Sequence, residues 1–255
     1  MNYDKFIGII PARYASTRFP GKPLQLIGGK SMIQRVYEQV SKVLQTVCVA
    51  TDDQRIFDAV EAFGGKVVMT SEHHKSGTDR CYEAFTKVGA GKSIVINIQG
   101  DEPFIQTSQI ETICHCFDQE ETQIATLVKP FKPADGTKAL FNPNSPKVLL
   151  NKNSEAIYFS RNVIPYIRGK EQEKWIQLHT YYKHIGLYAY RGDVLKEITQ
   201  LPQSSLELAE SLEQLRWIEN GYKIKVGITE VETIGIDTPD DLKAAEAFLQ
   251  KNFSK

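Results

Sequence analysis

The stretch IIPARYASTRFPGKPL, residues 9–24, follows a short β-branched run and gathers three cations, Arg13, Arg18 and Lys22, in one segment. Its three prolines exclude a helix at this point. In an open parallel sheet, the loop after the first strand is the usual place for a phosphate group. The stretch therefore predicts a first strand that leads into a phosphate-binding loop.

The first half of the chain alternates strand-like and helix-like segments. Apolar, β-branched runs are typical of strands, and apolar residues at helical spacing are typical of amphipathic helices. Strands are predicted over residues 5–10, 47–51, 66–69 and 93–98, and helices over 31–44, 54–63, 79–88 and 108–117. Nearly continuous apolar strands between such helices indicate an α/β fold with a mostly parallel sheet and helices on both faces.

After Thr122 the pattern becomes richer in strands with short connections. We expect strands over residues 123–130, 147–151, 156–161, 186–191 and 223–228, a helix over 205–219, and an irregular, mobile surface loop over 168–177. The stretch DTPDDLKAAEAFL, residues 237–249, predicts a helix that Thr238 caps and in which Pro239 occupies the first turn.

The overall charge excludes some classes of partner. The chain has 31 basic and 31 acidic residues among 255, so we expect no general binding to nucleic acid or to an anionic membrane. No apolar run reaches the roughly 20 residues that span a bilayer, and no secretion signal opens the chain, so a cytoplasmic protein is expected. Cys48, Cys81, Cys114 and Cys116 lack the spacing of a zinc site and are interpreted as reduced thiols.

The loop of residues 9–24 matches neither of two common phosphate-binding motifs. It lacks G-x-x-x-x-G-K-[ST], because Gly21 and Lys22 are followed by Pro23, and it lacks G-x-G-x-x-G. Guanidinium and ammonium groups can nevertheless hold a polyphosphate through side-chain contacts. The alternative is that these cations are ordinary solvated loop charges.

Two carboxylates favour the phosphate hypothesis. Asp101 in NIQGDEP, residues 97–103, follows an apolar strand, and Asp237 in GIDTP, residues 235–239, stands between a strand region and a helix start. Both can reach the sheet edge where the basic loop lies, and Mg²⁺ takes one or two carboxylates besides phosphate and water oxygens. Taken singly, Asp101 could be a turn residue and Asp237 a helix cap.

The ordered set of motifs resembles one enzyme family, the 3-deoxy-manno-octulosonate cytidylyltransferases, also called CMP-Kdo synthetases. The resemblance spans nearly the whole chain. The motifs that carry it are IIPARYASTRFPGKPL, VATDD (49–53), SGTDR (76–80), NIQGDEP, FNPNSPKV (141–148), YFSRNVIPY (158–166), KHIGLYAYR (183–191), LEQLR (212–216) and IDTPDDL (236–242). The first motif alone is shared with other sugar nucleotidyltransferases, whereas the set is specific.

The resemblance implies a fold, a reaction and an assembly. It implies a single nucleotidyltransferase domain over residues 1–255, Rossmann-like, with a nucleotide-binding sheet over about 1–125 and 222–255. A smaller β-rich subdomain for sugar binding and dimerisation would cover about 126–221. The expected reaction transfers CMP from CTP to the anomeric hydroxyl of the sugar acid Kdo and releases pyrophosphate, for lipopolysaccharide synthesis. Mg²⁺ is the expected cofactor and a homodimer the expected assembly.

The resemblance also implies roles for individual residues. Arg13, Ser16 and Lys22 would hold the CTP phosphates, and Arg80 and Gln99 lie where the family recognises nucleotide and sugar. The residues expected around Kdo are Arg18, Gln99, Arg161, His184, Tyr188, Glu213 and Gln214. Asp101 and Asp237 would bind magnesium, and together with Lys22 and Arg13 they form the expected catalytic group.

Some alternatives stay open at this level. The family often has Arg where this chain has Lys183, and the sequence does not say whether Lys183 contacts substrate. The acceptor could be 8-amino-Kdo, another acid sugar or a sugar phosphate. His184 could bind the sugar or be structural, and the helix with Glu213 and Gln214 could present a solvated face or a dimer contact. A nucleotide sensor without catalytic activity is the rival from another class.

Overall fold

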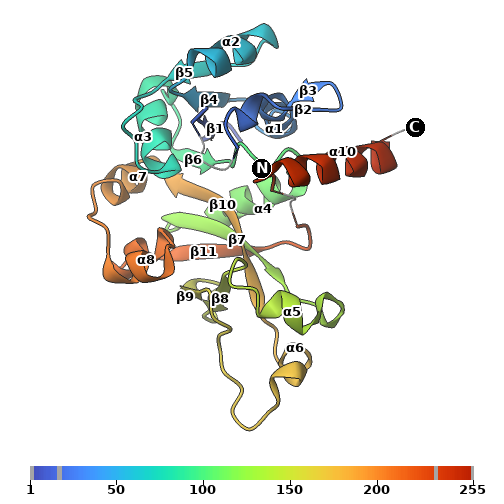
Figure 1. Cartoon of the computed structure of the whole chain (residues 1–255). Helices are drawn as coiled ribbons and strands as arrows, with labels where there is room; N and C mark the ends of the chain where they lie inside the picture. Colours follow the sequence, from blue (N-terminus) through green and yellow to red (C-terminus); the bar gives the residue numbers. More distant parts are fainter. Residues whose placement is uncertain (1–2, 16–18, 233–234, 254–255) are drawn as a thin grey trace. The chain divides into compact units, whose positions relative to one another are not determined.

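The computed structural model describes residues 3–15, 19–232 and 235–253 (Figure 1). The chain divides into two compact units. Unit 1 comprises Met1–Glu111 and Thr233–Lys255, and unit 2 comprises Thr112–Glu232. Unit 2 is longer at both ends than the β-rich subdomain predicted over about 126–221. The strands near its two ends, residues 124–130 and 224–228, pair with each other, and the first of them also pairs with the strand over 182–191.

Unit 1 is built on parallel strands, as the sequence predicts. The strands are β1 (Phe6–Ala12), β4 (Val47–Thr51), β5 (Val67–Met69) and β6 (Ile94–Asn97). β1 pairs with β6 on one side and with β4 on the other, and β4 pairs with β5, all in parallel. Every residue of β4 and β6 is buried, which explains why these strands read as continuous apolar runs.

Helices and two short strands complete unit 1. The helices are α1 (Met32–Val40), α2 (Gln54–Ala62), α3 (Gly77–Val88) and α10 (Pro239–Phe253), together with the 3-10 turn η1 (Lys22–Leu24). The two-residue strands β2 (Leu26–Ile27) and β3 (Lys30–Ser31) pair antiparallel. α4 (Thr107–His115) spans the boundary between the units.

The last helix joins the core of unit 1. Ala245 of α10 belongs to a buried apolar cluster with Ile27, Met32, Phe104 and Ile236. The helix starts as the sequence predicts: the Thr238 hydroxyl accepts a hydrogen bond from Asp241 N at 3.2 Å, and Asp241 accepts one in return from Thr238 N at 2.8 Å. This packing fixes the segment that carries Asp237.

Unit 2 holds a mixed set of strands. They are β7 (Ile124–Pro130), β8 (Lys147–Leu150), β9 (Ala156–Ser160), β10 (Tyr182–Arg191) and β11 (Ile224–Ile228). β7 pairs parallel with β11 and antiparallel with β10, while β8 pairs antiparallel with β9 and β10. The prediction of a β-rich second part is confirmed, and its β10 begins four residues before the predicted strand.

Short helices connect these strands. They are α5 (Gly136–Leu140), α6 (Trp175–Leu178), α7 (Gly192–Ile198), α8 (Ser205–Glu210) and α9 (Gln214–Glu219), with the 3-10 turns η2 (Cys116–Asp118), η3 (Pro133–Asp135) and η4 (Gln172–Lys174). The single helix predicted over 205–219 is wrong, because Ser211 adopts a left-handed conformation with φ 51° and ends α8.

The prediction of an irregular surface loop over 168–177 is also wrong in its second half. Residues 172–178 form η4 and α6, and Trp175 is only 2% exposed. Trp175 packs in a cluster with Leu140, Ile176 and Tyr181, and its indole N–H donates to Lys170 O at 3.0 Å. Two large apolar side chains, too few to show a period in the sequence, therefore anchor the segment.

Candidate active site

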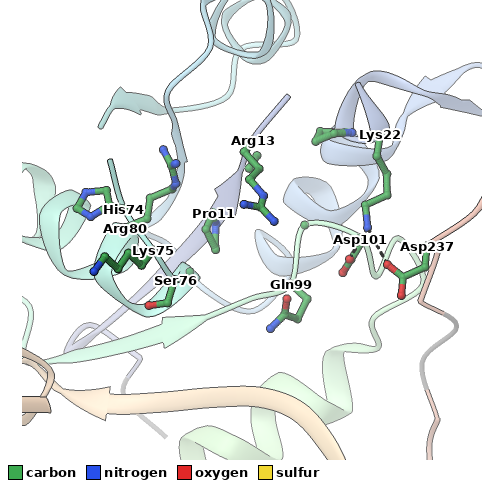
Figure 2. Close-up of a pocket in the computed structure, with 14 residues that line it drawn as sticks. Pro11, Arg13, Lys22, His74, Lys75, Ser76, Arg80, Gln99, Asp101 and Asp237 are labelled. Carbon is green, nitrogen blue, oxygen red and sulfur yellow. Dashed lines mark hydrogen bonds and ion pairs between the residues drawn. The ribbon is translucent and has the colours of Figure 1, made fainter. Parts of the chain in front are cut away.

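Unit 1 contains a cavity of about 280 Å³ at the end of its central strands (Figure 2). Its walls come from five segments that are far apart in the sequence. The lining residues are Pro11, Ala12 and Arg13 after β1, Lys22 and Pro23 of η1, His74–Gly77 and Arg80 around the start of α3, Gln99–Asp101 after β6, and Asp237 before α10.

The cavity lies where two neighbouring parallel strands end. β1 and β6 are adjacent, so the loops that leave their carboxyl ends emerge side by side. Gly100 allows the loops to approach closely, because a Cβ at this position would lie 3.0 Å from Pro11 O. The absence of that Cβ brings Gln99 and Asp101 beside the basic loop.

Local backbone geometry directs Lys22 into the cavity. Gly21 has φ 67°, a conformation that favours glycine, and its N–H donates to Tyr14 O at 2.9 Å. Pro23 then occupies the first turn of η1, where its missing N–H costs nothing. The Lys22 side chain, 15% exposed, thereby extends toward the two aspartates.

Lys22 brings together the two carboxylates that the sequence singles out. Its Nζ lies 2.7 Å from Asp101 Oδ2 and 3.2 Å from Asp237 Oδ1 (Figure 2). Ile236 N also donates to Asp101 O at 3.0 Å, so backbone and side chains both join these segments. The expectation that the two aspartates share one sheet edge with the basic loop is confirmed.

The cavity offers two carboxylates, Asp101 and Asp237, as possible metal ligands. Such a pair fits an ion that takes its other ligands from phosphate and water, as Mg²⁺ does. Within the described residues there is no group of three His, Cys, Asp or Glu side chains that could hold an ion. Mg²⁺ is commonly held by one or two carboxylates and completes its shell with water and phosphate oxygens. Asp101 and Asp237, which both contact Lys22, fit that requirement.

Arg80 forms a charged wall of the cavity. It is 5% exposed, and its guanidinium donates to Asp52 Oδ2 at 2.5 Å and to Thr70 Oγ1 at 2.6 Å. A buried guanidinium fixed in this way is held in one orientation. Arg80 and Gln99 both line the cavity, as do Arg13 and Lys22, whereas Ser16 and Arg18 lie outside the described residues.

Sequence reasoning missed the segment His74–Gly77 as part of the wall. His74 Nε2 contacts Glu83, and the same carboxylate accepts from Lys87 Nζ at 2.6 Å and from Ser71 N at 2.9 Å. Burial alone would raise the pKa of Glu83, but these hydrogen bonds outweigh it and lower the pKa to about 2. The capping box between Ser76 and Asp79, readable in SGTDR, marks where α3 begins beside the cavity.

The remaining predicted residues belong to unit 2. Arg161 donates from Nε to Glu210 O at 2.6 Å and from its two terminal nitrogens to Pro143 O at 3.0 Å and Ser211 O at 3.3 Å. The guanidinium thus ties two backbone segments of unit 2, at Pro143 and at Glu210–Ser211, to the segment that carries Arg161. The predicted contact between Arg161 and the sugar remains a prediction. The structure adds a structural role for Arg161, which the sequence did not indicate.

His184 lies in an aromatic environment. Its Nε2 is 3.0 Å from Thr126 Oγ1, and its ring centroid is 5.1 Å from that of Phe159 and 5.3 Å from that of Tyr188. Burial lowers the pKa of His184 to about 3, so the imidazole is neutral near pH 7. Burial also raises the pKa of Tyr188, so its phenol keeps its proton.

Glu213 directly precedes α9, and Gln214 is the first residue of that helix. Gln214 is 4% exposed, and Glu213 Oε1 lies 3.3 Å from the Arg216 guanidinium. Arg216 also pairs with the buried Glu207 at 2.8 Å, which joins the two short helices. The alternative of a solvated helix face is therefore wrong for Gln214, because its side chain is buried.

Lys183 and His184 face opposite sides of β10, as neighbouring strand residues do. Lys183 Nζ contacts Glu232, whose other oxygen lies 3.0 Å from Lys129 Nζ. These three side chains line a separate cavity of about 240 Å³ within unit 2. Lys183, which stands where the family often has Arg, is therefore engaged in an ion pair with Glu232.

The four cysteines are free and buried, which agrees with their interpretation as reduced thiols. In the described part of the chain, no helix combines the length and the apolar character needed to cross a bilayer.

Comparison with known proteins places the chain in a family. A family model described as cytidylyltransferase matches residues 7–224. The 3-deoxy-manno-octulosonate cytidylyltransferase of Phocaeicola vulgatus is 73% identical over 247 residues, which cover 97% of this chain and 98% of that protein. The protein of the same name from Parabacteroides distasonis is 73% identical over 246 residues, covering 96% and 98%.

A solved structure agrees over the full length. The structure of CMP:2-keto-3-deoxy-manno-octonic acid synthetase complexed with CTP superposes with a TM-score of 0.88 at 43% identity, covering 98% of this chain and 100% of that one. The α/β fold with a mostly parallel sheet is thereby confirmed. The chain belongs to the cytidylyltransferase family, among the 3-deoxy-manno-octulosonate cytidylyltransferases.

Proposed function

We propose that this protein transfers CMP from CTP to the anomeric hydroxyl of Kdo and releases pyrophosphate, supplying CMP-Kdo for lipopolysaccharide synthesis. The observation that carries the proposal is the convergence of Arg13, Lys22, Asp101 and Asp237 on one cavity at the end of parallel strands. The family members named above, one of them solved with CTP, support the choice of nucleotide and acceptor.

The triphosphate would bind in the cavity of unit 1. Arg13 and Lys22 supply positive charge there, and Ser16 is the proposed hydroxyl donor. Arg80, fixed by Asp52 and Thr70, and Gln99 would contact the rest of the nucleotide. Pre-oriented groups of this kind lower the cost of binding a flexible polyphosphate.

Asp101 and Asp237 would hold Mg²⁺. When bound, the ion would polarise the phosphate oxygens and offset their negative charge. The fit rests on two carboxylates already gathered around one cation, with the remaining ligand positions left to phosphate and water.

The chemical step would be an in-line displacement at the α-phosphorus. The anomeric oxygen forms the new O–P bond, the bond to the pyrophosphate oxygen breaks, and the hydroxyl proton is lost to solvent or a phosphate oxygen. The role of Arg13 and Lys22 is to stabilise the charge that grows on the phosphoryl oxygens. Positioning and charge stabilisation suffice for such a transfer, so no covalent enzyme intermediate is needed.

Recognition of the sugar acid is assigned to Arg18 and to residues of unit 2. Those residues are Arg161, His184, Tyr188, Glu213 and Gln214. A neutral His184 suits a hydrogen bond to a sugar hydroxyl, because it carries one donor and one acceptor nitrogen. Arg161 would have to combine its three backbone contacts with any contact to the sugar carboxylate.

We also propose a cytoplasmic homodimer. Free, buried cysteines are usual in a reducing compartment. Unit 2 exposes large apolar side chains, with Tyr166 70%, Leu178 54% and Ile157 53% exposed, and such residues are enriched at subunit interfaces. Sedimentation of the purified chain would test the dimer.

The test of function is turnover with a panel of acceptors. Pyrophosphate release is measured with CTP and Kdo, 8-amino-Kdo, another acid sugar or a sugar 1-phosphate. We expect robust release with Kdo, while preference for 8-amino-Kdo would select the alternative acceptor. Activity with only the sugar 1-phosphate would refute the assignment, and CTP binding by calorimetry without any product would favour the nucleotide sensor.

A further inference from the structure

Lys22 contacts both carboxylates that are proposed to hold magnesium. Its ammonium lies within hydrogen-bond distance of both carboxylates assigned to the metal, at 2.7 Å from Asp101 and 3.2 Å from Asp237. The same side chain is assigned to the triphosphate. Lys22 therefore has two sets of anionic partners, the two carboxylates and the phosphates of CTP, and it can bind them one after the other.

The ammonium is a fitting substitute for a metal in this place. Two carboxylates close together repel each other, and a cation between them removes that repulsion. The three groups are partly withdrawn from water, with side-chain exposures of 15% for Lys22, 30% for Asp101 and 48% for Asp237, so their attraction exceeds that of fully exposed charges. The geometry holds the carboxylates together before any ion arrives.

Lysine and metal cannot share the carboxylates on equal terms. Mg²⁺ binds oxygen at about 2.0–2.1 Å and demands near-octahedral ligands. An ammonium donating to the same oxygen atoms would compete for their lone pairs and repel the divalent ion at short range. Entry of the metal therefore requires that Lys22 leave at least one of the two carboxylates.

CTP offers Lys22 another partner. The triphosphate carries several negative charges and would bind beside Arg13 in the same cavity. Lysine is a flexible side chain with a compact charge, so its ammonium can turn from a carboxylate to a phosphate oxygen. The displaced carboxylates are then available to the ion that accompanies the triphosphate.

We propose that Lys22 is a placeholder cation: it preserves the geometry of the metal site in the nucleotide-free protein and excludes divalent ions until CTP binds. This inference rests on the proposed function, because it takes Asp101 and Asp237 as the metal ligands. It predicts positive coupling, in which CTP and metal each strengthen binding of the other.

The test is direct metal binding without nucleotide, using Mn²⁺ and titration calorimetry. Wild-type protein is expected to bind Mn²⁺ weakly, whereas Lys22→Met, which removes the charge, is expected to bind it about tenfold more tightly or better. Lys22→Gln provides a second neutral variant should the first fail to fold, as judged by thermal unfolding. Lys22→Arg keeps a cation and is expected to keep the exclusion.

Matched variants separate this effect from general changes in charge. Lys75→Met removes a lysine of the same cavity and is expected to leave Mn²⁺ binding as in the wild type. Adding Asp101→Asn to Lys22→Met is expected to abolish the gain. Unchanged or weaker Mn²⁺ binding in both neutral variants would overturn the proposal, since a merely supportive lysine predicts a loss when it is removed.

One further measurement distinguishes failure of this inference from failure of the metal assignment. Anomalous scattering from crystals grown with Mn²⁺ and non-hydrolysable CTP would locate the ion. An ion between Asp101 and Asp237, without the predicted gain in Lys22→Met, would refute the placeholder role alone. An ion held by other residues would refute the proposed metal site and the inference with it.

Discussion

Asp101 is the residue whose conservative replacement tests the active site most directly. Asp101→Asn preserves volume but weakens a proposed magnesium ligand and its pairing with Lys22. We expect kcat to fall by about 100-fold or more at millimolar Mg²⁺, comparable to the loss of a principal electrostatic group. Pyrophosphate release under saturating substrates is the measurement.

Asp240→Asn is the matched control for this experiment. Asp240 lies near Asp237 in the sequence, but its side chain is 89% exposed and pairs with Lys243. Near-normal turnover is expected in this variant. Near-normal turnover in Asp101→Asn as well, with an unchanged circular dichroism spectrum, would contradict the metal role of Asp101.

His184 predicts a pH dependence of stability. The folded protein keeps this imidazole neutral down to a pKa of about 3, whereas the unfolded chain protonates it near 6.5. The unfolded state thus binds more protons as the pH falls from about 6.5 toward 3, and the free energy of unfolding decreases by up to about 1.4 kcal/mol per pH unit. Above pH 6.5 this loss is absent.

Urea unfolding at pH 7.5 and pH 5 measures the effect. Carboxylates titrate in the same range, so the comparison is with His184→Gln, whose stability should depend less steeply on pH. His115→Gln, which replaces a histidine whose side chain is 60% exposed, should retain the wild-type slope. Parallel slopes for wild type and His184→Gln would contradict the burial argument.

Residues of the site were predictable to different degrees. Asp101, Asp237 and Lys22 could be found because each stands in a short motif at the end of a predicted strand or before a helix. The placement of Lys22 between the carboxylates could not, since Asp237 is 215 positions away in the sequence. The backbone contacts of Arg161 were equally hidden, because carbonyl acceptors leave no trace in residue type.

At the scale of elements, α6 offers a test of a segment predicted as a loop. Trp175→Ala removes a side chain that is 2% exposed and packs against Leu140 and Tyr181. We expect the free energy of unfolding to fall by about 3 kcal/mol, the usual cost of removing a large buried aromatic ring. Urea unfolding gives the value, and proteolysis near residue 170 should accelerate.

Leu178→Ala in the same helix serves as its control, because Leu178 is 54% exposed. A change within about 0.5 kcal/mol is expected there. Equal, small effects of both substitutions would show that the cluster contributes little and that the segment behaves as a loop.

The break between α8 and α9 makes a second prediction for an element. Ser211 has φ 51°, which strains residues with a side chain but suits glycine. Ser211→Gly should raise the free energy of unfolding by about 0.5 kcal/mol, whereas Ser211→Val should lower it by more than about 1 kcal/mol, because a β-branched residue resists this conformation. Stabilisation by valine would contradict the geometry.

Elements were easiest to predict where one periodicity dominated. β4 and α2 agree with their predicted ranges to within one residue, because burial on both faces and amphipathic spacing gave clear patterns. The break between α8 and α9 could not be predicted from the sequence, because the helical spacing of apolar residues over 205–219 continues through Ser211. Tertiary contacts accompany the break, among them the hydrogen bond from Arg161 to Ser211 O.

For the molecule as a whole, the division into two units predicts which part of the backbone CTP protects from hydrogen exchange. The cavity proposed to bind CTP is lined by residues of unit 1, so CTP alone should slow amide exchange in segments 11–15, 22–25, 74–80, 99–102 and 235–238. Hydrogen exchange followed by mass spectrometry checks this. Protection confined to unit 2 would contradict the assignment of the nucleotide site.

Asp237 reaches the cavity from a segment that lies far from the other lining residues in the sequence. Residues 1–111 contain the basic loop, Asp101 and most of the cavity lining, whereas the segment of Asp237 docks through Ile236 and α10. A variant truncated before Asp237 would keep Lys22 and Asp101 but lack half of the acidic pair. We expect such a variant to sequester nucleotide without consuming it.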